Sequence, residues 1–225
     1  MMADMPRRIR TRRSPPDAAP APAAVTPPRC PWCAGSEIER DYHDREWGVP
    51  IADERALFEL LTLEGAQAGL AWRTVLAKRD GYREAFAGFD PVRVARFDAR
   101  RVARLLDNPA IVRHRGKIES TLTNARAILA LHRAGGSLAS LAWSIVGHRP
   151  RAPRHAHQAE VPARTVDSDA LAARLAAHGF RFVGSTTAYA FMQAAGLTND
   201  HVVGCHRYDP CDAAGRAFAV SPRGS

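Results

Sequence analysis

Apolar residues recur every three or four positions through most of the chain, which is the period of amphipathic helices. Leu57, Leu60 and Leu61 have this spacing behind Asp53, whose carboxylate can cap a helix that runs toward Glu64. The same criteria predict further helices through Trp72, Val75 and Leu76, within 80–90, from Asp90 and Pro91, over 98–106, from Ile118 to a stop at Gly135 and Gly136, after Ser137, over 168–178, over 187–195, and after Asn199. Together these segments predict a bundle of short helices.

One segment has the β-branched and aromatic content of a strand, the FRFVGSTT run at 180–187. The chain offers it no second strand to pair with, so we interpret it as a bend between helices. The sequence also has no internal repeat. The fold class that follows from these patterns is all-α.

The composition divides the chain into three parts. Residues 1–28 are rich in Pro, Ala and Arg and carry no apolar face, so we predict a disordered tail. The helical domain is expected over 29–208, and 209–225 is expected to form a loose C-terminal tail. Within the domain, the prolines and basic residues of 148–162 predict an exposed loop.

The net charge of +9 over 225 residues favours an anionic partner, and nucleic acid is the first candidate. Five arginines and two aspartates place +3 of this charge in 1–28, which leaves +6 for the rest of the chain. No apolar run reaches the ~18 residues of a membrane span, and the first thirty residues lack the apolar region of a secretory signal. We therefore expect a cytoplasmic protein with no membrane partner.

Four cysteines lie in two pairs near opposite ends of the expected domain, at Cys30, Cys33, Cys205 and Cys211. In an intracellular chain such pairs favour metal or redox chemistry over structural disulfides. If the segment after Asn199 is helical, His201 and Cys205 leave one face of it about a turn apart. Cys30 and His43 would complete a set of two Cys and two His, which suits tetrahedral Zn²⁺.

Other interpretations use the same residues. Cys33 could replace His43 as a ligand, and the CPWC sequence at 30–33 has the spacing of a redox dithiol. A thioredoxin-type site needs a strand before the motif, and none is predicted here. The remaining alternative is a set of buried cysteines and hydrogen-bonded histidines without a metal.

The run YHDREWGVP at 42–50 concentrates aromatic and polar chemistry. Tyr42 can donate a hydrogen bond while presenting an apolar ring, and a turn fixed by glycine and proline can direct Trp47. Glu64 lies in the apolar LEGAQAGLAW segment, where a sheltered carboxylate needs a hydrogen-bond donor. With Tyr42 and Trp72 it could form a pocket for a nucleobase. The alternative is a glutamate that caps a neighbouring helix and a tryptophan that fills the core.

The segment AIVRHRGKI at 110–118 joins two predicted helices and gathers basic residues. A helix-hairpin-helix element uses such a turn to direct backbone N–H groups at DNA phosphate, with cations nearby. The candidate DNA contacts are Arg113, Arg115, Gly116 and Lys117.

Six blocks in the same order resemble the Tag family, the bacterial 3-methyladenine DNA glycosylases I. They are YHDREWGVP, LEGAQAGLAW, FDPVRVA, IVRHRGKI, GFRFVGSTTAYAFMQAAGL and NDHVVGC, between about Cys30 and Cys205. The resemblance implies an all-helical helix-hairpin-helix glycosylase fold and a monomer that associates with the nucleoid when bound to DNA. It further implies base-excision repair: hydrolysis of the N-glycosidic bond of 3-methyladenine in alkylated double-stranded DNA, leaving an abasic site.

The resemblance also implies a role for each candidate. One structural Zn²⁺ would be held by Cys30, His43, His201 and Cys205, without Cys33. Glu64, the catalytic residue, and Tyr42 would hydrogen-bond the flipped 3-methyladenine, and Trp72 would stack on it, with Trp32 and Trp47 near the pocket. The chain departs from the family pattern at Glu39, where tyrosine is usual, and at Ala110, where glycine is frequent.

Two alternative functions are kept. A noncatalytic, zinc-stabilised DNA-binding module would account for the charge and the hairpin alone. A bifunctional glycosylase would use Lys117 to form a Schiff base with the abasic sugar.

Overall fold

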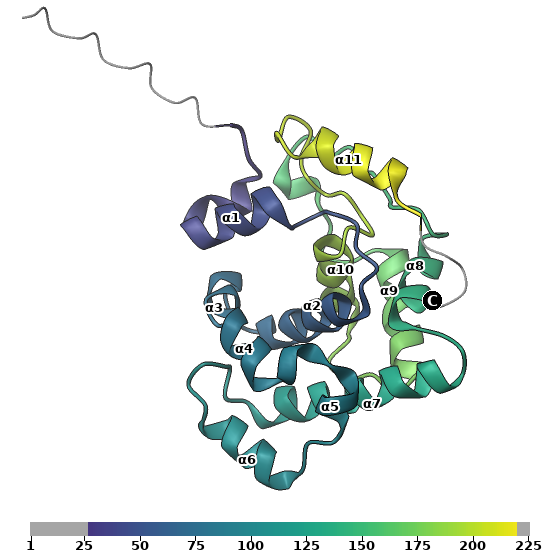
Figure 1. Cartoon of the computed structure of the whole chain (residues 1–225). Helices are drawn as coiled ribbons and strands as arrows, with labels where there is room; N and C mark the ends of the chain where they lie inside the picture. The colour runs from purple at the N-terminus through teal and green to yellow at the C-terminus, as the bar shows by residue number, and fades with distance from the viewer. Residues whose placement is uncertain (1–26, 220–225) are drawn as a thin grey trace, which may run out of the picture.

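Helices and turns make up the structure of residues 27–219, a computed structural model (Figure 1). The α-helices are α1 (Glu37–Arg45), α2 (Glu54–Gln67), α3 (Trp72–Leu76), α4 (Arg79–Ala85), α5 (Pro91–Ala95), α6 (Ala99–Asp107), α7 (Arg115–Arg133), α8 (Leu138–Ile145), α9 (Val166–Ala177), α10 (Ser185–Ala194) and α11 (Tyr208–Ala217). Three short 3-10 helices are η1 (Pro31–Gly35), η2 (Ala87–Phe89) and η3 (Gln158–Glu160). Between residues 27 and 219 strand pairing is limited to one isolated bridge, from Arg151 to Thr198, which confirms the all-α class.

The predicted N-terminal tail lies almost entirely outside the described residues, because the structure begins at residue 27. Three predicted helix starts within the domain are confirmed by their caps. Asp53 accepts a hydrogen bond from Ala56 N–H at 2.8 Å, and Asp90 accepts one from Val92 N–H at 2.9 Å. Ser137 caps α8. Each such cap contributes about 1 kcal/mol to its helix.

Helix α2 is the centre of the fold, with α3 and α4 on one side of it and α8 and α9 on the other (Figure 1). Every residue from Leu57 to Ala66 is buried, because α2 packs against α3, α7, α8 and α10. Glu64 is therefore carried into the interior by the helix that organises the core. None of the helices within 27–219 has the length and apolar character needed to cross a membrane.

The run at 42–50 is divided between a helix and a turn. Tyr42 and His43 lie in the last turn of α1, a helix that the spacing of apolar residues does not predict. Ser36 caps this helix by accepting from Glu39 N–H. The turn begins after α1, and Gly48 adopts φ +80° there, which supports the expected turn and buries Trp47 against the domain.

The helix predicted after Asn199 is wrong. Residues 199–207 form turns, and Gly204 has φ +99°, a conformation that ends any regular helix. Two consecutive valines and a glycine also give this segment low helix propensity. The segment is held instead by tertiary hydrogen bonds, among them Val203 N–H to the His155 carbonyl at 2.8 Å.

The loose tail predicted over 209–225 is wrong for residues 209–217, which belong to α11. Pro210 is tolerated because it lies in the first turn, where its missing N–H is not needed. The helix buries Tyr208, Cys211 and Gly215, and a Cβ at Gly215 would lie 3.2 Å from the Pro150 ring. Packing against the 148–162 loop therefore stabilises a helix whose own sequence favours it weakly.

Close contact between the α10 terminus and the turn after α1 makes Gly196 a sensitive position. Gly196 has φ +70°, and a Cβ there would clash with the backbone of Val49 and Pro50. Gly196→Ala should lower the free energy of unfolding by about 3 kcal/mol, from left-handed strain and displaced backbone. Gly135 is the matched control, because it has φ +76° with nothing within 4 Å, and Gly135→Ala should show the strain alone. Equal losses for the two variants in urea unfolding would contradict this account.

Candidate active site and metal centre

A pocket of about 290 Å³ lies where α1, α2, α3 and α10 approach one another. Its lining includes all five residues predicted to bind a base, namely Trp32, Tyr42, Trp47, Glu64 and Trp72. These residues come from η1, α1, the turn that follows α1, α2 and α3. The fold therefore brings together side chains that are up to 40 positions apart in the sequence.

Glu64 is the electrostatic centre of this pocket. Only 6% of the residue is exposed, and no hydrogen bond from a residue within 27–219 reaches its carboxylate. Burial raises the pKa of Glu64 to about 8, since a charged carboxylate without a partner loses its hydration. The predicted alternative, a glutamate that caps a neighbouring helix, is not what the structure has. A ligand with a donor group or a positive charge would supply the missing partner.

Aromatic rings form the walls beside this carboxylate. The Tyr42 and Trp72 ring centroids are 5.4 Å apart, and those of Trp32 and Trp47 are 5.1 Å apart. Trp72 is only partly buried and lines the pocket, so part of its side chain is accessible to a ligand there. Such a pocket favours a flat, polarisable ring system over an aliphatic ligand.

Several polar atoms on the pocket wall lack partners. Trp32 Nε1, the Tyr42 hydroxyl and Gln158 Oε1 are buried and make no hydrogen bond with any residue of the described chain. Burial, and then the charge of Glu64, hold the pKa of Tyr42 well above its usual range, so the phenol stays a donor. Buried polar groups without partners are rare in folded proteins. Their gathering on one pocket indicates a ligand with complementary polar atoms.

Four further polar residues line the same pocket, namely Glu39, Gln67, Gln158 and Gln193. Sequence patterns did not identify the three glutamines. Glu39 is the departure from the family pattern, and its carboxylate at the pocket accepts a hydrogen bond from the Ser36 hydroxyl at 2.7 Å. Gln158 comes from the predicted exposed loop, which lies otherwise on the surface. A polar residue on a helix or loop normally indicates solvent exposure, so no signal in the sequence marks these glutamines.

The four predicted metal ligands converge in a second buried cluster next to the pocket. Cys30, His43, His201 and Cys205 each offer one ligand atom, and these atoms all lie within 4.8 Å of one another. Cys205 Sγ is 3.4 Å from His43 Nε2 and 3.5 Å from His201 Nδ1. Zinc bonds of about 2.3 Å to sulfur and 2.0–2.1 Å to nitrogen give a tetrahedral S–N edge of about 3.6 Å. The spacing therefore fits one tetrahedral ion.

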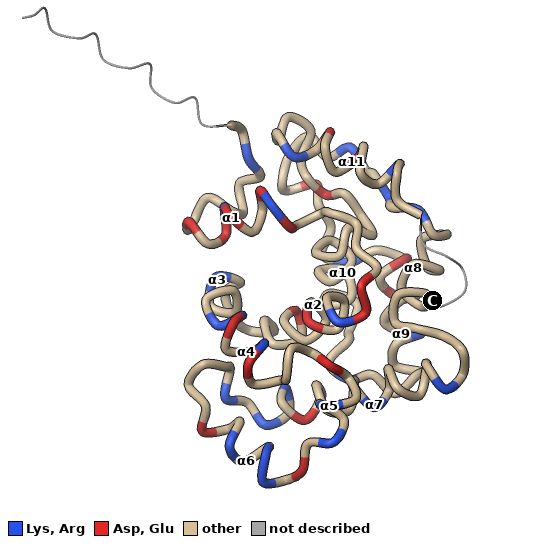
Figure 2. Tube along the Cα trace, viewed as in Figure 1, with Lys and Arg blue, Asp and Glu red and all other residues tan. Residues whose placement is uncertain are grey.

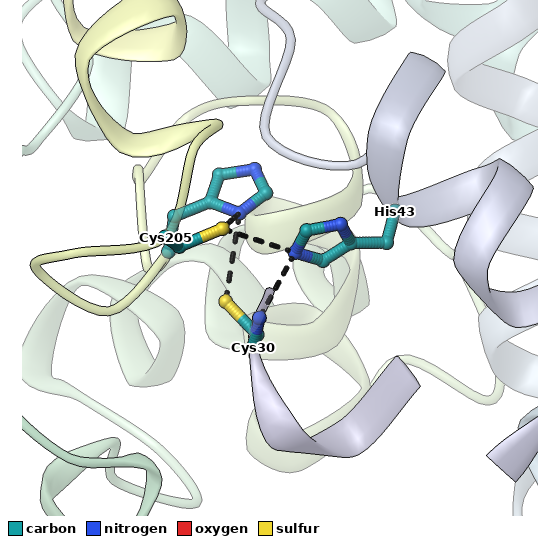
Figure 3. A group of neighbouring side chains, drawn as sticks. Cys30, His43 and Cys205 are labelled. Carbon is teal, nitrogen blue, oxygen red and sulfur yellow. Dashed lines mark hydrogen bonds between the residues drawn. The ribbon is translucent and has the colours of Figure 1, made fainter. Parts of the chain in front are cut away.

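The chemistry around the ligands also fits a metal. Figure 3 shows Cys30, His43 and Cys205 pointing toward one another. His43 Nδ1 bonds to Asp44 Oδ1 at 2.8 Å, and His201 Nε2 bonds to the Trp47 carbonyl at 3.0 Å. Because both outer partners accept, each inner nitrogen is left with a lone pair, as metal ligation requires. The hydrogen bond with Cys30, and then those with the two histidines, lower the pKa of Cys205.

Cys33 and Cys211 are outside this cluster. The Cys33 thiol donates to the Cys30 carbonyl at 3.1 Å, and burial raises the pKa of Cys33 to about 11. A thiol with so high a pKa is a poor nucleophile. All four cysteines are free, and no strand precedes the CPWC motif in the described chain. These contacts give no support to the redox interpretation or to Cys33 as a ligand.

The basic segment at 110–118 joins α6 to α7. Gly116 lies in the first turn of α7, and His114 caps that helix by accepting from Lys117 N–H. Arg113 and Arg115 are exposed. Figure 2 shows Lys and Arg positions on α3, α6 and the segment before α7. The helix start and the exposed arginines have the geometry expected of a phosphate contact.

Lys117 makes hydrogen bonds with backbone carbonyls that sequence patterns did not predict. Its ammonium donates to the Ala66 carbonyl at 2.8 Å and to the Ala68 carbonyl at 2.7 Å, at the end of α2. Burial lowers the pKa of Lys117. The residue is not among those that line the pocket, so the geometry does not favour it as a Schiff-base nucleophile. Its contact with DNA stays a prediction.

A buried, unpaired carboxylate inside an aromatic pocket of a helical fold is typical of a protein that binds a planar ligand with a donor group or a positive charge. A family described as methyladenine glycosylase matches residues 32–208, and the chain belongs to this family.

Individual relatives cover most of the chain. It is 48% identical over 180 residues to DNA-3-methyladenine glycosylase 1 of Escherichia coli strain K12, a match that spans 80% of this chain and 96% of the relative. It is 45% identical over 183 residues to DNA-3-methyladenine glycosylase of Haemophilus influenzae, spanning 81% and 97%. A crystal structure of a 3-methyladenine DNA glycosylase I (TAG) matches with a TM-score of 0.78 at 50% identity, spanning 80% and 98%. The predicted family is thereby confirmed.

Proposed function

We propose that this protein is a monofunctional DNA glycosylase that releases 3-methyladenine from alkylated double-stranded DNA by hydrolysis. The observation that carries the proposal is Glu64, a buried carboxylate without a partner inside an aromatic pocket. Methylation at N3 makes adenine cationic while it is attached to deoxyribose. A damaged base therefore offers the Glu64 carboxylate a positive charge and N–H donors as partners. An undamaged base is neutral and offers no such charge.

The substrate's own chemistry lowers the demand on the enzyme. When the C1′–N9 bond breaks, its electron pair stays with the base, which departs neutral. Water adds to C1′ and loses a proton, leaving an abasic site. The protein's tasks are to hold the base out of the duplex, to stack it on Trp72 and to keep the Glu64 carboxylate beside the positive charge. Glu64 acts as an electrostatic and recognition group, with no acid needed for the leaving base.

The roles of the neighbouring side chains follow from their position. Tyr42 donates a hydrogen bond to the base, and Trp32 and Trp47 close the pocket. Two solved relatives carry a tyrosine-to-phenylalanine and a glutamate-to-glutamine change at positions 22 residues apart, and the first is a complex with 3-methyladenine. Tyr42 and Glu64 are also 22 residues apart in this chain. The equal separation supports these two residues as ligand contacts.

DNA binding is assigned to the α6–α7 pair acting as a helix-hairpin-helix element. The start of α7 presents backbone N–H groups to a phosphate, and Arg113, Arg115, Gly116 and Lys117 would supply the surrounding contacts. The protein acts as a monomer, since one chain holds the pocket and this element together.

One structural zinc ion is assigned to Cys30, His43, His201 and Cys205. A closed set of four protein ligands leaves no position for water, so the ion would supply cross-linking of the two chain ends and no catalysis. The support is the spacing of the ligand atoms and the outer bonds that orient both histidines.

The proposed reaction is tested by incubating the purified protein with methylated duplex DNA and separating the released bases by chromatography. We expect free 3-methyladenine and abasic DNA. Borohydride should trap no covalent protein–DNA adduct, because Lys117 is held on backbone carbonyls away from the pocket. Binding to DNA without release of a methylated purine would refute the proposal and favour a noncatalytic zinc-stabilised module.

The pH dependence provides a second prediction. Since the pKa of Glu64 is raised to about 8, its carboxylate form is lost as the pH falls through that value. The apparent second-order rate constant, kcat/KM, should therefore rise between pH 6.5 and pH 8.5 and level off above, because kcat/KM reports groups of the free enzyme. Chromatographic measurement of released base avoids the alkaline breakage of abasic DNA. A profile that is flat over this interval would contradict the assignment of the ionised form.

A further inference from the structure

Gln193 enters the pocket from α10 with its side-chain amide held in one orientation. Its Nε2 donates to Asp200 Oδ2 at 2.7 Å. Asp200 is only 1% exposed, and it also accepts from the Tyr189 hydroxyl at 2.5 Å and the Thr198 hydroxyl at 3.0 Å. A carboxylate has no hydrogen to donate, so the amide nitrogen and not its oxygen must face it.

This anchoring leaves the amide oxygen of Gln193 for a ligand. Gln193 lines the pocket together with Glu64 and Trp72, whereas Asp200 does not line it. Since the nitrogen faces Asp200, the oxygen lies on the opposite side of the planar amide. No donor from residues 27–219 bonds to that oxygen, and the residue is only half-buried. Gln193 therefore offers a neutral acceptor with a fixed polarity, and it lines the same pocket as the charged acceptor of Glu64.

The fixed orientation of its side-chain amide distinguishes Gln193 from the other glutamines of the pocket. No hydrogen bond from residues 27–219 holds the amide of Gln67, and Gln158 has a buried amide oxygen without a partner. Either of these amides can turn to present its N–H or its carbonyl to a ligand. Only a group that cannot turn can reject a ligand with the wrong polarity.

We propose that Gln193 is a specificity-determining residue, whose carbonyl accepts a hydrogen bond from the exocyclic amine of 3-methyladenine and selects against 3-methylguanine. Adenine carries a donor at C6, whereas guanine carries a carbonyl oxygen there. Both N3-methylated bases are cationic in DNA, so the charge of Glu64 attracts them equally. A guanine would place its O6 against the Gln193 oxygen, and two acceptors cannot pair. Asp200 is the positioning residue that keeps this polarity.

The proposal rests on the glycosylase function and is tested by the ratio of 3-methyladenine to 3-methylguanine released from one methylated DNA sample. Gln193→Met keeps the length and volume of the side chain and removes the carbonyl. The ratio should fall about tenfold, since one base contact commonly contributes that degree of discrimination. Asp200→Asn should also lower the ratio, because an asparagine amide can donate to Gln193 and let its amide turn.

Gln67→Met is the matched control, since it removes a pocket glutamine whose amide has no fixed orientation. Its ratio should stay close to that of the wild type. A purely structural role of Gln193 would lower the release of both bases in the same proportion, so an unchanged ratio in Gln193→Met would overturn the proposal. An equal fall in Gln67→Met would overturn it too. Zinc content is measured for Asp200→Asn, because Asp200 precedes the ligand His201.

The two levels of the hypothesis fail in different ways. A wild-type protein that releases neither base refutes the glycosylase function itself. A wild-type protein that releases 3-methyladenine, with no change of ratio in the Gln193 variant, refutes only the role of Gln193. Circular dichroism checks folding, and Gln193→Ala gives the same comparison if the methionine variant does not fold.

Discussion

Changing His43 to alanine is expected to abolish binding of the proposed zinc ion and to lower the free energy of unfolding by several kcal/mol. Structural zinc ions contribute about 10 kcal/mol or more to small domains at neutral pH, and losing one of four ligands weakens most of that binding. The ligands come from both ends of the domain, Cys30 and His43 on one side and His201 and Cys205 on the other. The loss should therefore weaken the junction between these segments and leave it to backbone hydrogen bonds such as His206 N–H to the Pro28 carbonyl at 2.9 Å.

Loss of the ion should also loosen the base pocket without touching its chemistry. Tyr42 precedes His43 on α1, and the Trp47 carbonyl accepts from His201. Each of these two pocket residues is thus joined directly to a proposed metal ligand, Tyr42 by the peptide bond to His43 and Trp47 by the hydrogen bond from His201. The affinity of His43→Ala for free 3-methyladenine, followed by tryptophan fluorescence, should fall together with its zinc content.

Cys33→Ala is the matched control for the metal. The Cys33 thiol is buried beside the cluster but bonds to a backbone carbonyl, so its removal should cost about 1 kcal/mol of packing and keep the zinc. Metal analysis of purified proteins should give one zinc per chain for the wild type and for Cys33→Ala. Loss of zinc in Cys33→Ala with retention in His43→Ala would refute the ligand assignment.

The periodicity of apolar residues and the capping residues were enough to predict most helices, because both follow from local chemistry, whereas the roles of the site residues came from the family resemblance. Asp53, Asp90 and Ser137 cap their helices by contacts within three residues. Residues 199–207 and α11 depend on distant partners, and no local pattern records these. Val202 N–H bonds to Cys30 Sγ at 3.4 Å across 172 positions, so the proposed metal ligands are positioned by tertiary contacts.

The four-residue spacing of His201 and Cys205 shows how two side chains can converge as predicted although the predicted element is wrong. The spacing predicted a shared helix face, yet the segment forms turns and still delivers both ligand atoms to one point. The pocket glutamines show the opposite case. Gln193 lies on a predicted helix, but its proposed role depends on Asp200, which becomes its partner only when the end of α10 folds against the following turn.

Changing Glu64 to glutamine should lower base release about 100-fold or more while it stabilises the protein. Glutamine keeps the shape and a hydrogen-bonding oxygen but cannot balance the positive charge of the substrate. In the absence of substrate the same charge lowers the free energy of unfolding, since the buried carboxylate has no partner. Activity and stability should therefore move in opposite directions, as expected of a group that is kept for its chemistry.

The sign of the pH dependence follows from the raised pKa. Burial raises the pKa of Glu64 from 4.5 to about 8, so the folded state prefers the neutral acid. The contribution of Glu64 to stability is therefore fully present below pH 4.5, and it is lost progressively as the pH rises through the folded value of about 8. Glutamine does not titrate, so the advantage of Glu64→Gln should grow by roughly 2 kcal/mol between pH 6 and pH 8.

Glu39→Gln is the control that separates this effect from a general loss of negative charge. Glu39 lies in the same pocket, but its carboxylate already accepts a hydrogen bond from Ser36, so the substitution should give no comparable gain. Urea unfolding of the three proteins at pH 6 and pH 8 provides the comparison, with the zinc content measured at both pH values. If Glu64→Gln and the wild type lose stability in parallel as the pH rises, then Glu64 is not a buried, unpaired acid, and the electrostatic basis of the proposed recognition is wrong.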